Sequence, residues 1–429
     1  MKWVLGRCRE ARDLGRGGVK VNEIAGALAL ADIAGPQRAM APALPDDPNP
    51  DECTVMVDGN RLTLVPDGPP RLTDLLAMIE GAERTLRMLY YIYSADRSGE
   101  QVRDALVRAA ERGVAVSLLI DGFGSAGVPE HYFDALVEAG GRFCRFNPSL
   151  GRRYVLRNHQ KLVLADEKIA LIGGFNVEDS YFGTNDEGAW RDIGLIVEGP
   201  AAARLAPYFD SLMNWTQRKG ARLRSLRTMM RRFSEHQGQV QWLFGGPMQR
   251  RSPLAVATVR DMADANQLEM IAAYFAPSST MVKRIARVAR FGRARVITAS
   301  KSDNHATIDA ARSTYSRLIR RKVELFEYAP TKLHSKLLIM DDVVHLGSSN
   351  FDIRSLYINM EMMLRVDDVK FAMMMRGFFE HEIGDSIAIT PSVHRKRGTW
   401  LQRLRWKIGF FLVSSLDFNV TRRLVRRDG

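Results

Sequence analysis

The sequence has few cysteines and no long hydrophobic run. Its three cysteines, Cys8, Cys53 and Cys144, are too few for a disulfide framework, and no two have Cys-x-x-Cys spacing. The longest apolar stretches, 24–31 and 408–416, are shorter than the roughly 18–20 residues of a membrane-spanning helix. No clear signal peptide follows Met1. We therefore expect a cytoplasmic protein without a transmembrane helix.

Acidic residues are also scarce relative to basic ones. The 429 residues include 62 Lys and Arg against 49 Asp and Glu, which gives a net charge of +13. This excess favours a polyanionic partner, either nucleic acid or a membrane surface that carries phospholipid phosphates. Composition does not choose between these two partners. The length predicts two domains.

Helix and strand patterns alternate in two stretches of the chain, which predicts an α/β fold. A hairpin of strands 54–57 and 62–65 around Asp58-Gly59-Asn60 precedes the first stretch. The expected helices are 75–85, 99–112, 281–291 and 304–321, and the expected strands are 86–93, 114–120, 295–299 and 323–328.

These patterns divide the chain into five parts. They are an N-terminal tail with a proline-rich linker (1–50), a first α/β domain (51–215), a basic connecting segment (216–239), a second α/β domain (240–390) and a basic aromatic C-terminal tail (391–429). Residues 218–232 carry seven basic and no acidic side chains, which predicts an exposed helical bridge.

The sequence contains an internal duplication. His159-Gln160-Lys161 is followed by Asp166, and His334-Ser335-Lys336 is followed by Asp341, so each copy reads His-x-Lys-x4-Asp with an offset of 175. One short pattern of common residues recurs by chance, whereas two copies in matched surroundings indicate a shared chemistry. The candidate catalytic residues are His159, Lys161, Asp166, His334, Lys336 and Asp341.

Each copy has the pattern of a strand, a turn and a second strand. The apolar runs 162–165 and 169–172 flank Asp166-Glu167-Lys168. Because side chains alternate across a strand, His159 and Lys161 share one face. Asp166 has the opposite parity and falls at the turn, so we expect it to hold the turn rather than to contact a substrate.

Two asparagines extend the duplication. Gly173-Gly174-Phe175-Asn176 matches Gly347-Ser348-Ser349-Asn350 with an offset of 174. Two His, two Lys and two Asn suit a phosphate: lysine and asparagine bind its oxygens, one imidazole attacks phosphorus, and the other protonates the leaving oxygen. Asn176 and Asn350 are therefore candidate phosphate-binding residues, and we expect no metal and no cofactor.

Two carboxylates complete the candidate site. A histidine nucleophile is neutral, with its second nitrogen held by an acceptor. Asp192 lies 33 residues after His159, and Glu361 lies 27 residues after His334. Each carboxylate comes before a similar apolar strand pattern, so both are candidate histidine-orienting residues.

The sequence resembles the phospholipase D superfamily, whose signature is the duplicated His-x-Lys-x4-Asp motif, and within it the bacterial cardiolipin synthases. The resemblance covers roughly residues 70–390. It rests on the two motifs and on Asp121-Gly122-Phe123-Gly124-Ser125, Gly173-Gly174-Phe175-Asn176, Trp190-Arg191-Asp192, Tyr274-Phe275, the GSSNFDIRS segment that begins at Gly347, Asn359 and Glu361.

The resemblance implies two similar phospholipase D-type α/β sandwich halves with one active site at their interface. It implies a phosphohistidine intermediate without metal, with His159 as nucleophile, His334 as acid and then base, and Asp192 and Glu361 orienting the imidazoles. The implied reaction joins two phosphatidylglycerol molecules into cardiolipin and releases glycerol. The alternatives are a hydrolytic phospholipase D and a phosphodiesterase that acts on nucleic acid. Nucleic acid is the disfavoured binding partner.

The C-terminal tail mixes basic and aromatic residues. Residues 395–429 hold ten basic and two acidic side chains, with Trp406, Phe410 and Phe411 among them. Such a segment is typical of contact with the headgroups of an anionic membrane, and the alternative is a helix docked on the second domain. We expect anionic phospholipid as substrate and peripheral attachment to the inner membrane.

Overall fold

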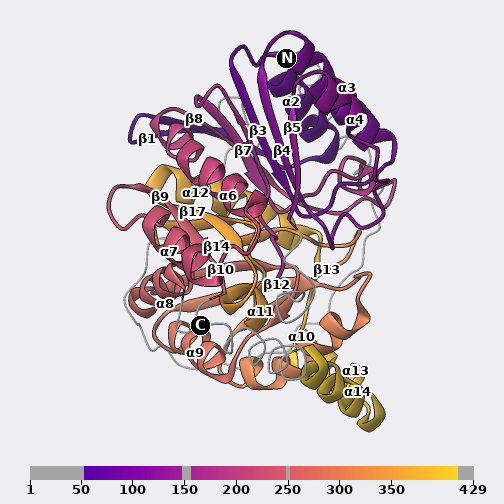
Figure 1. The fold of residues 1–429 in the computed structure, drawn as a ribbon. Coiled ribbons are helices and arrows are strands. Elements are labelled where there is room, and N and C mark those ends of the chain that lie inside the picture. Colours follow the sequence, from indigo (N-terminus) through magenta and orange to yellow (C-terminus); the bar gives the residue numbers. More distant parts are fainter. Residues whose placement is uncertain (1–52, 147–155, 248–251, 414–429) are drawn as a thin grey trace, which may run out of the picture. The chain divides into compact units, whose positions relative to one another are not determined.

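The computed structural model describes residues 53–146, 156–247 and 252–413. The predicted tail and linker at 1–50 lie outside these residues. The described residues from Thr54 onward belong to one compact unit that contains two α/β halves (Figure 1). No helix among the described residues combines the length and the apolar character needed to cross a membrane.

The first half is built on an eight-stranded sheet with the order β1-β2-β8-β7-β6-β3-β4-β5. Strands β3, β4 and β5 are parallel, and the other neighbours are antiparallel. The bounds are β1 (Thr54–Val57), β2 (Asn60–Val65), β3 (Thr85–Tyr90), β4 (Ala115–Asp121), β5 (Arg142–Phe146), β6 (Leu162–Ala165), β7 (Ile169–Gly173) and β8 (Gly194–Glu198).

The second half repeats this arrangement in the order β18-β13-β12-β10-β14-β15-β17-β9. Strands β6, β7 and β8 correspond to β14, β15 and β17, and the parallel trio is β10, β12 and β13. The bounds are β9 (Val240–Gly245), β10 (Gln267–Ala272), β12 (Arg293–Ala299), β13 (Glu324–Tyr328), β14 (Lys336–Met340), β15 (Val343–Gly347), β17 (Glu361–Asp367) and β18 (Ser386–Ala388). A short parallel pair, β11 (Phe275–Ala276) and β16 (Phe351–Asp352), lies beside this sheet. The predicted α/β fold with two similar halves is confirmed.

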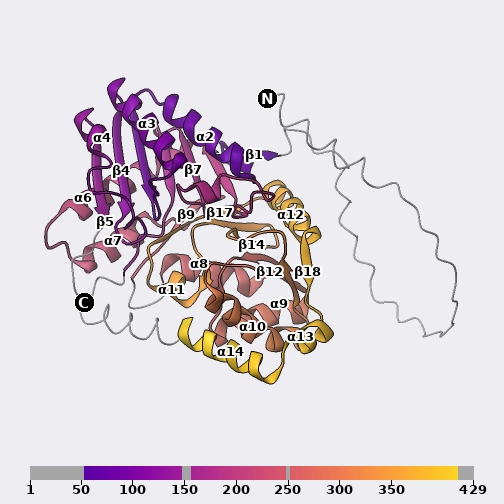
Figure 2. The same ribbon diagram turned by 90° about the vertical axis from the view of Figure 1, so that its right-hand side faces the viewer.

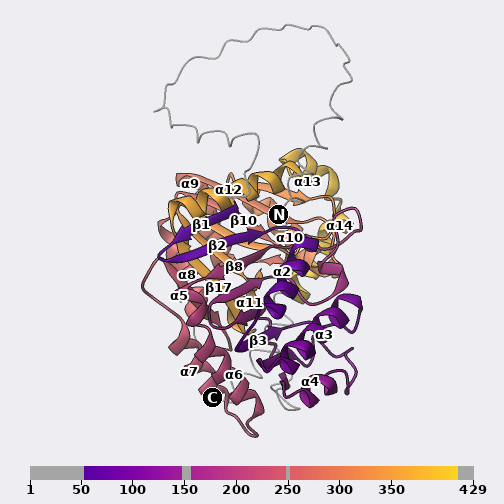
Figure 3. The ribbon, with the colours of Figure 1, turned by 90° about the horizontal axis from the view of Figure 1, so that it is seen from above.

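Helices cover the sheets. In the first half, α2 to α4 lie together on one side of β3, and α6 and α7 lie on the other (Figure 3). Figure 2 shows α14 along the outer edge of the second half, next to α10 and α13. The bounds are α2 (Gly68–Glu80), α3 (Arg97–Glu111), α4 (Asp134–Glu138), α5 (Pro200–Ala203), α6 (Ala206–Gln217), α7 (Leu223–Phe233), α8 (Pro253–Asp264), α9 (Ser279–Phe291), α10 (His305–Ile319), α11 (Ile353–Tyr357), α12 (Val369–Gly384), α13 (Pro391–Arg397) and α14 (Trp400–Phe411).

One hydrophobic core is shared by both halves. Leu162 and Leu164 of β6 and Leu337 and Ile339 of β14 belong to the same buried cluster, so the two repeated strands contribute to a common interior. Each half also has a separate core beneath its outer helices. This shared core fixes the two motif strands relative to each other, which positions the residues just before them.

Two predicted elements differ from the structure. The helix predicted at 75–85 begins earlier, at Gly68, where prolines occupy its first turn, and it ends at Glu80. The basic segment 218–232 is not an exposed bridge throughout. Its helix α7 buries Leu223, Leu226, Arg227 and Met230, because their spacing of three or four residues places them on one face.

Candidate active site

Both motif histidines lie where the two halves exchange backbone hydrogen bonds. The His159 N–H donates to Met360 O at 2.9 Å, next to the start of β17. The His334 N–H donates to Arg191 O at 2.7 Å, just before β8. The backbone of each histidine is therefore held by the opposite half of the chain.

The side-chain pairs cross in the same way. The Nδ1 atom of His159 lies 3.0 Å from Glu361 Oε2, and the Nδ1 atom of His334 lies 2.6 Å from Asp192 Oδ2. All four residues are buried. A carboxylate accepts the Nδ1–H proton in each pair, which leaves Nε2 as the nitrogen with a free lone pair.

The surroundings favour neutral imidazoles. Burial lowers the pKa of His159, and the ammonium groups of Lys161 and Lys336 lower it further against the opposing effect of Glu361. Burial and the charge of Lys336 lower the pKa of His334 to about 3. Near neutral pH both histidines of the free protein therefore have the form that a nucleophile or a general base requires.

The two motif lysines are almost completely buried in the same site. Lys161 Nζ donates to His159 O at 2.7 Å, and Lys336 Nζ donates to His334 O. Burial lowers the pKa of Lys161 to about 7 and that of Lys336 to about 8, and the charge of Lys336 adds to the effect on Lys161. Two buried lysines whose charges influence each other form a site for an anion.

The motif asparagines lie just after the return strands β7 and β15. Asn176 Oδ1 accepts the N–H of Ile92 at 3.1 Å, and Asn176 is 1% exposed. Asn350 is 4% exposed, and its Oδ1 atom is buried without a hydrogen-bond partner in the described part of the chain. A buried amide oxygen without a partner is costly, and because it can only accept, a bound donor such as a hydroxyl group would satisfy it.

The carboxylates of Asp166 and Asp341 lie at the motif turns rather than beside the two imidazoles. Asp166 lies at the end of β6 away from His159, where its carboxylate accepts the backbone N–H groups of residues 83, 84 and 85 at 2.7–3.0 Å. Asp341 accepts the N–H groups of Asn266 and Gln267 in the same way. Both have a φ of 51°, which fits the turn expected from the parity of Asp166.

Glycine at position 174 is required by the geometry of the site. A Cβ atom there would lie 2.7 and 2.8 Å from the two carboxylate oxygens of Asp192 and 3.0 Å from Lys336 Nζ. The equivalent residue of the other half is Ser348, whose hydroxyl donates to Glu361 Oε2 at 2.5 Å. The two half-sites are therefore similar but unequal.

Aromatic rings surround the imidazoles, and the sequence interpretation did not assign them a place in the site. The ring of Tyr91 packs 4.8 Å from that of His159. Tyr181, Trp190 and Tyr274 lie 5.2, 5.4 and 6.3 Å from the ring of His334. The alternation of side chains at 90–93 could have placed Tyr91 on the other face of the strand from the buried Tyr90. It does not show that the ring of Tyr91 packs against His159.

The site contains cations rather than a cluster of metal ligands. In residues 53–146, 156–247 and 252–413, no group of three or more His, Cys, Asp or Glu side chains is arranged to hold a metal ion. The duplicated halves and paired histidines define an enzyme of the phospholipase D type.

The comparisons with known proteins agree with this class. The family model described as "Cardiolipin synthase, PLD-like domain" matches residues 75–213 and 259–383, so the chain belongs to this family. The chain is 28% identical over 360 residues to the major cardiolipin synthase ClsA of Bacillus subtilis, covering 81% of this chain and 74% of that protein. It is 29% identical over 356 residues to cardiolipin synthase 1 of Bacillus anthracis, covering 79% and 70%.

Solved structures share the fold at low sequence identity. The phosphatidylserine synthase of Haemophilus influenzae has a TM-score of 0.65 at 14% identity, over 84% of this chain and 95% of that one. The polyphosphate kinase of Porphyromonas gingivalis has a TM-score of 0.50 at 13% identity, over 81% and 52%. These two similarities concern the fold alone.

Proposed function

We propose that the protein is a phosphatidyltransferase that transfers the phosphatidyl group of one phosphatidylglycerol to a second, forming cardiolipin and releasing glycerol. The observation that carries the proposal is the pair of crossed histidine–carboxylate hydrogen bonds beside two buried lysines. The similarity to proteins named cardiolipin synthases supports this choice of substrate.

In the first step, Nε2 of His159 attacks the phosphorus of the donor. A nitrogen–phosphorus bond forms, the bond between phosphorus and the headgroup oxygen breaks, and His334 donates a proton to that oxygen so that glycerol leaves. The free protein favours neutral His334, but the negative charge of a bound phosphodiester raises the pKa of a neighbouring imidazole. Substrate binding therefore favours the protonated acid that this step uses.

In the second step, His334 takes the proton from a hydroxyl of the second phosphatidylglycerol. That oxygen attacks phosphorus, and the nitrogen–phosphorus bond to His159 breaks. Lys161, Lys336, Asn176 and Asn350 bind the phosphate oxygens in both steps, and Glu361 and Asp192 hold the two imidazoles with Nε2 toward phosphorus. His159 thus acts as the nucleophile, and His334 acts as the general acid and then as the general base.

The substrate requires contact with a lipid surface, so the same proposal includes peripheral attachment to the cytoplasmic side of the inner membrane. The excess of basic residues in 395–429 supports it.

The test is incubation of the purified protein with phosphatidylglycerol vesicles, followed by separation of the lipid products. Cardiolipin and glycerol in equal amounts support the proposal. Phosphatidic acid without cardiolipin would identify a hydrolase, and cleavage of nucleic acid with no lipid turnover would identify a nucleic-acid phosphodiesterase. A parallel reaction with a chelator tests the expected independence from metal ions, and activity should survive it.

Trapping assigns the two histidines. With a donor that has a good leaving group, His334→Ala should still accumulate labelled phosphatidyl on the protein, because only the acid is lost. His159→Ala should accumulate none. Label found on His334 in the wild-type protein would reverse the assignment.

A further inference from the structure

Helix α14 docks on α10 by one side only. Trp406 is 3% exposed and stacks on His394 of α13 at 5.3 Å, and a Cβ atom at the buried Gly409 would lie 2.7 Å from the Cβ of Asp309. Arg405 also forms an ion pair with Asp309 at 3.0 Å. These contacts support the docked-helix interpretation of residues 400–411.

The opposite side of α14 is apolar and exposed. At 100° per residue its apolar side chains fall within an arc of about 120°. They are Trp400, Leu401, Leu404, Ile408, Phe411 and Leu412, which are 74, 59, 50, 51, 54 and 45% exposed. We call these six residues the outer stripe. Six large apolar side chains side by side on a surface indicate a binding face rather than chance exposure.

Cations border the outer stripe on both sides. On the same helical projection Arg403 and Lys407 lie along one edge, and Arg405, which also pairs with Asp309, lies along the other. Aromatic and aliphatic side chains flanked by cations are the pattern of a helix that lies in the headgroup layer of an anionic bilayer, where long basic side chains extend to the phosphates. A second protein as partner would require acidic groups placed to match both edges.

A group of cations that form no ion pair with a described acidic residue lies near the start of α14. Gly409 packs near the N-terminal end of α10, and Arg403 lines a cleft with Ser316 and Arg317, so the two helices are antiparallel. The first turn of α14 is therefore at the C-terminal end of α10. A cleft of about 460 Å³ at that end is lined by Lys283, Arg287, Arg290, Arg320, Arg321 and Lys322, with Ala286 and Phe291, and none of the described residues that line it is acidic.

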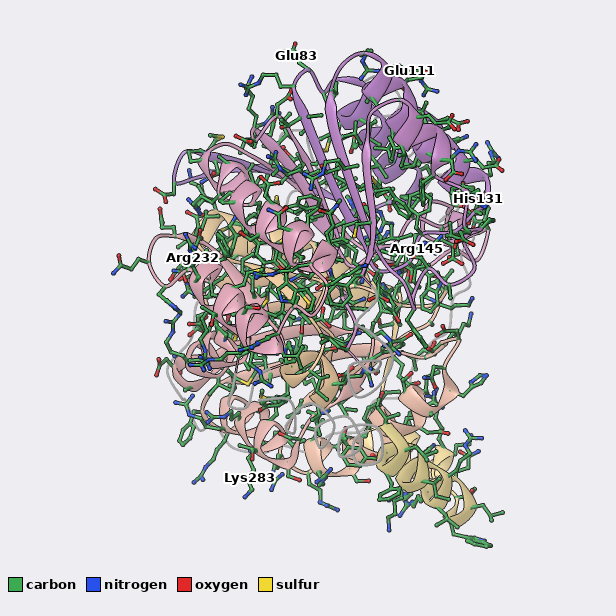
Figure 4. The ribbon with its side chains drawn as sticks, viewed as in Figure 1. Glu83, Glu111, His131, Arg145, Arg232 and Lys283 are labelled. Carbon is green, nitrogen blue, oxygen red and sulfur yellow. The ribbon has the colours of Figure 1, made fainter. Side chains whose placement is uncertain are left out.

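The aromatic residue of this cleft is exposed in the same manner as the outer stripe. Phe291 is 62% exposed, and the guanidinium groups of Arg287 and Arg290 lie 5.7 and 5.3 Å from the centre of its ring. Figure 4 shows Lys283 pointing away from the lower side of the molecule, the side where Figure 1 places α9 and α14. Cations and exposed apolar groups thus occur together on this part of the second half.

We infer that α14 is an interfacial helix that attaches the protein to an anionic bilayer, with the outer stripe inserted among the lipids and the cleft cations contacting the phosphates. The inference rests on the proposed lipid substrate, but it assigns the attachment to described surface residues rather than to the whole basic tail. The docked side of α14 fixes the bilayer-binding side chains to the enzyme.

The test is sedimentation of the full-length protein with phosphatidylglycerol vesicles. The variant Leu401→Gln/Leu404→Gln/Ile408→Gln/Phe411→Gln should bind at least about tenfold more weakly, because four inserted apolar groups are lost. Its melting temperature and its turnover of a short-chain, water-soluble phosphodiester should stay at wild-type values, since these side chains face outward. A control variant, Met56→Gln/Val137→Gln/Val256→Gln, changes apolar residues that are 63, 51 and 51% exposed elsewhere and should bind normally.

The cleft cations are tested separately. Lys283→Gln/Arg287→Gln/Arg290→Gln/Arg321→Gln should weaken binding and reduce its salt dependence, whereas Arg224→Gln/Arg231→Gln/Arg232→Gln on α7 should not. Phosphatidylcholine vesicles should bind the wild-type protein poorly.

Wild-type binding by the outer-stripe variant would overturn the inference. So would a wild-type dimer that this variant dissociates, since a second copy would then cover the stripe. Stripe-dependent vesicle binding by a protein that turns over no phosphodiester would uphold the attachment and reject the proposed function.

Discussion

Asp192 and His334 are 142 residues apart in the chain, and their side chains form a 2.6 Å hydrogen bond. Glu361 and His159, 202 residues apart, form the matching bond at 3.0 Å. In each pair the carboxylate comes from the half that does not contain the histidine. Neither half therefore holds a complete histidine–carboxylate pair, and the duplication yields one site rather than two.

This crossing predicts the effect of neutralising the carboxylates. In Asp192→Asn the side-chain amide can donate to Nδ1 of His334, which favours the tautomer with its proton on Nε2. Glu361→Gln should act in the same way on His159. We expect each change to lower kcat by roughly 100-fold or more and to leave the fold intact, measured as lipid turnover and melting temperature.

The exposed acid Asp67 provides the control for the Asp192→Asn and Glu361→Gln variants. It is bonded to Arg191, next to Asp192 in sequence, but it contacts neither histidine. Asp67→Asn should retain near-normal kcat. Equal losses in all three variants would argue against an orienting role.

A second prediction concerns Gly174. A Cβ atom there would lie within 3.0 Å of the Asp192 carboxylate and Lys336 Nζ, so these groups would have to shift. Gly174→Ala should therefore displace the groups that hold His334 and reduce kcat by about 100-fold.

Gly127 offers a matched glycine outside the site. A Cβ atom there would meet nothing within 4 Å, so Gly127→Ala should behave as wild type in the same turnover assay. If Gly174→Ala also retained full turnover, the position of Asp192 would not be as constrained as the structure indicates.

The paired histidines, lysines and asparagines of the candidate site could be identified from the sequence because the duplication repeats them. Local periodicity also predicted the turn at Asp166.

The pairing of carboxylate with histidine could not be predicted, because Asp192 follows His159 in sequence and only the packing of the two sheets brings it to His334. The place of Tyr91 could not be predicted either, since a tyrosine in an apolar strand has the same pattern in a core and beside an imidazole. The buried face of α7 could not be predicted, because the seven basic residues of 218–232, which include the buried Arg227, indicated an exposed segment.

A third prediction separates Asp166 from catalysis. Its carboxylate accepts three backbone N–H groups that connect the motif turn to the start of β3. Asn also tolerates the positive φ of this turn, but it loses the negative charge, so Asp166→Asn should lower the free energy of unfolding by about 1–3 kcal/mol. The measurement is urea denaturation, together with kcat at a temperature where the variant is folded. A large fall in kcat without a loss of stability would return Asp166 to the catalytic group.

The last prediction concerns pH and follows from the lysines. Burial lowers the pKa of Lys161 to about 7 and that of Lys336 to about 8. As pH rises through these values the free enzyme loses one and then both ammonium charges, and with them its attraction for an anionic phosphodiester. We therefore expect kcat/KM to fall from about pH 7 upward, with the fall expressed mainly in KM.

Two features of this profile distinguish the lysines from other groups. A bound phosphodiester raises both lysine pKa values by its negative charge, so kcat should remain constant to a higher pH than kcat/KM. Lys161→Arg keeps its charge at every pH tested. It should lower activity through altered geometry, and the decline of its kcat/KM should begin nearer pH 8, where Lys336 titrates. The assay uses a short-chain, water-soluble phosphodiester, so that attachment to vesicles does not enter the profile. A wild-type kcat/KM that stays level to pH 9, or a Lys161→Arg profile that coincides with it, would contradict the assignment of this limb to the lysines.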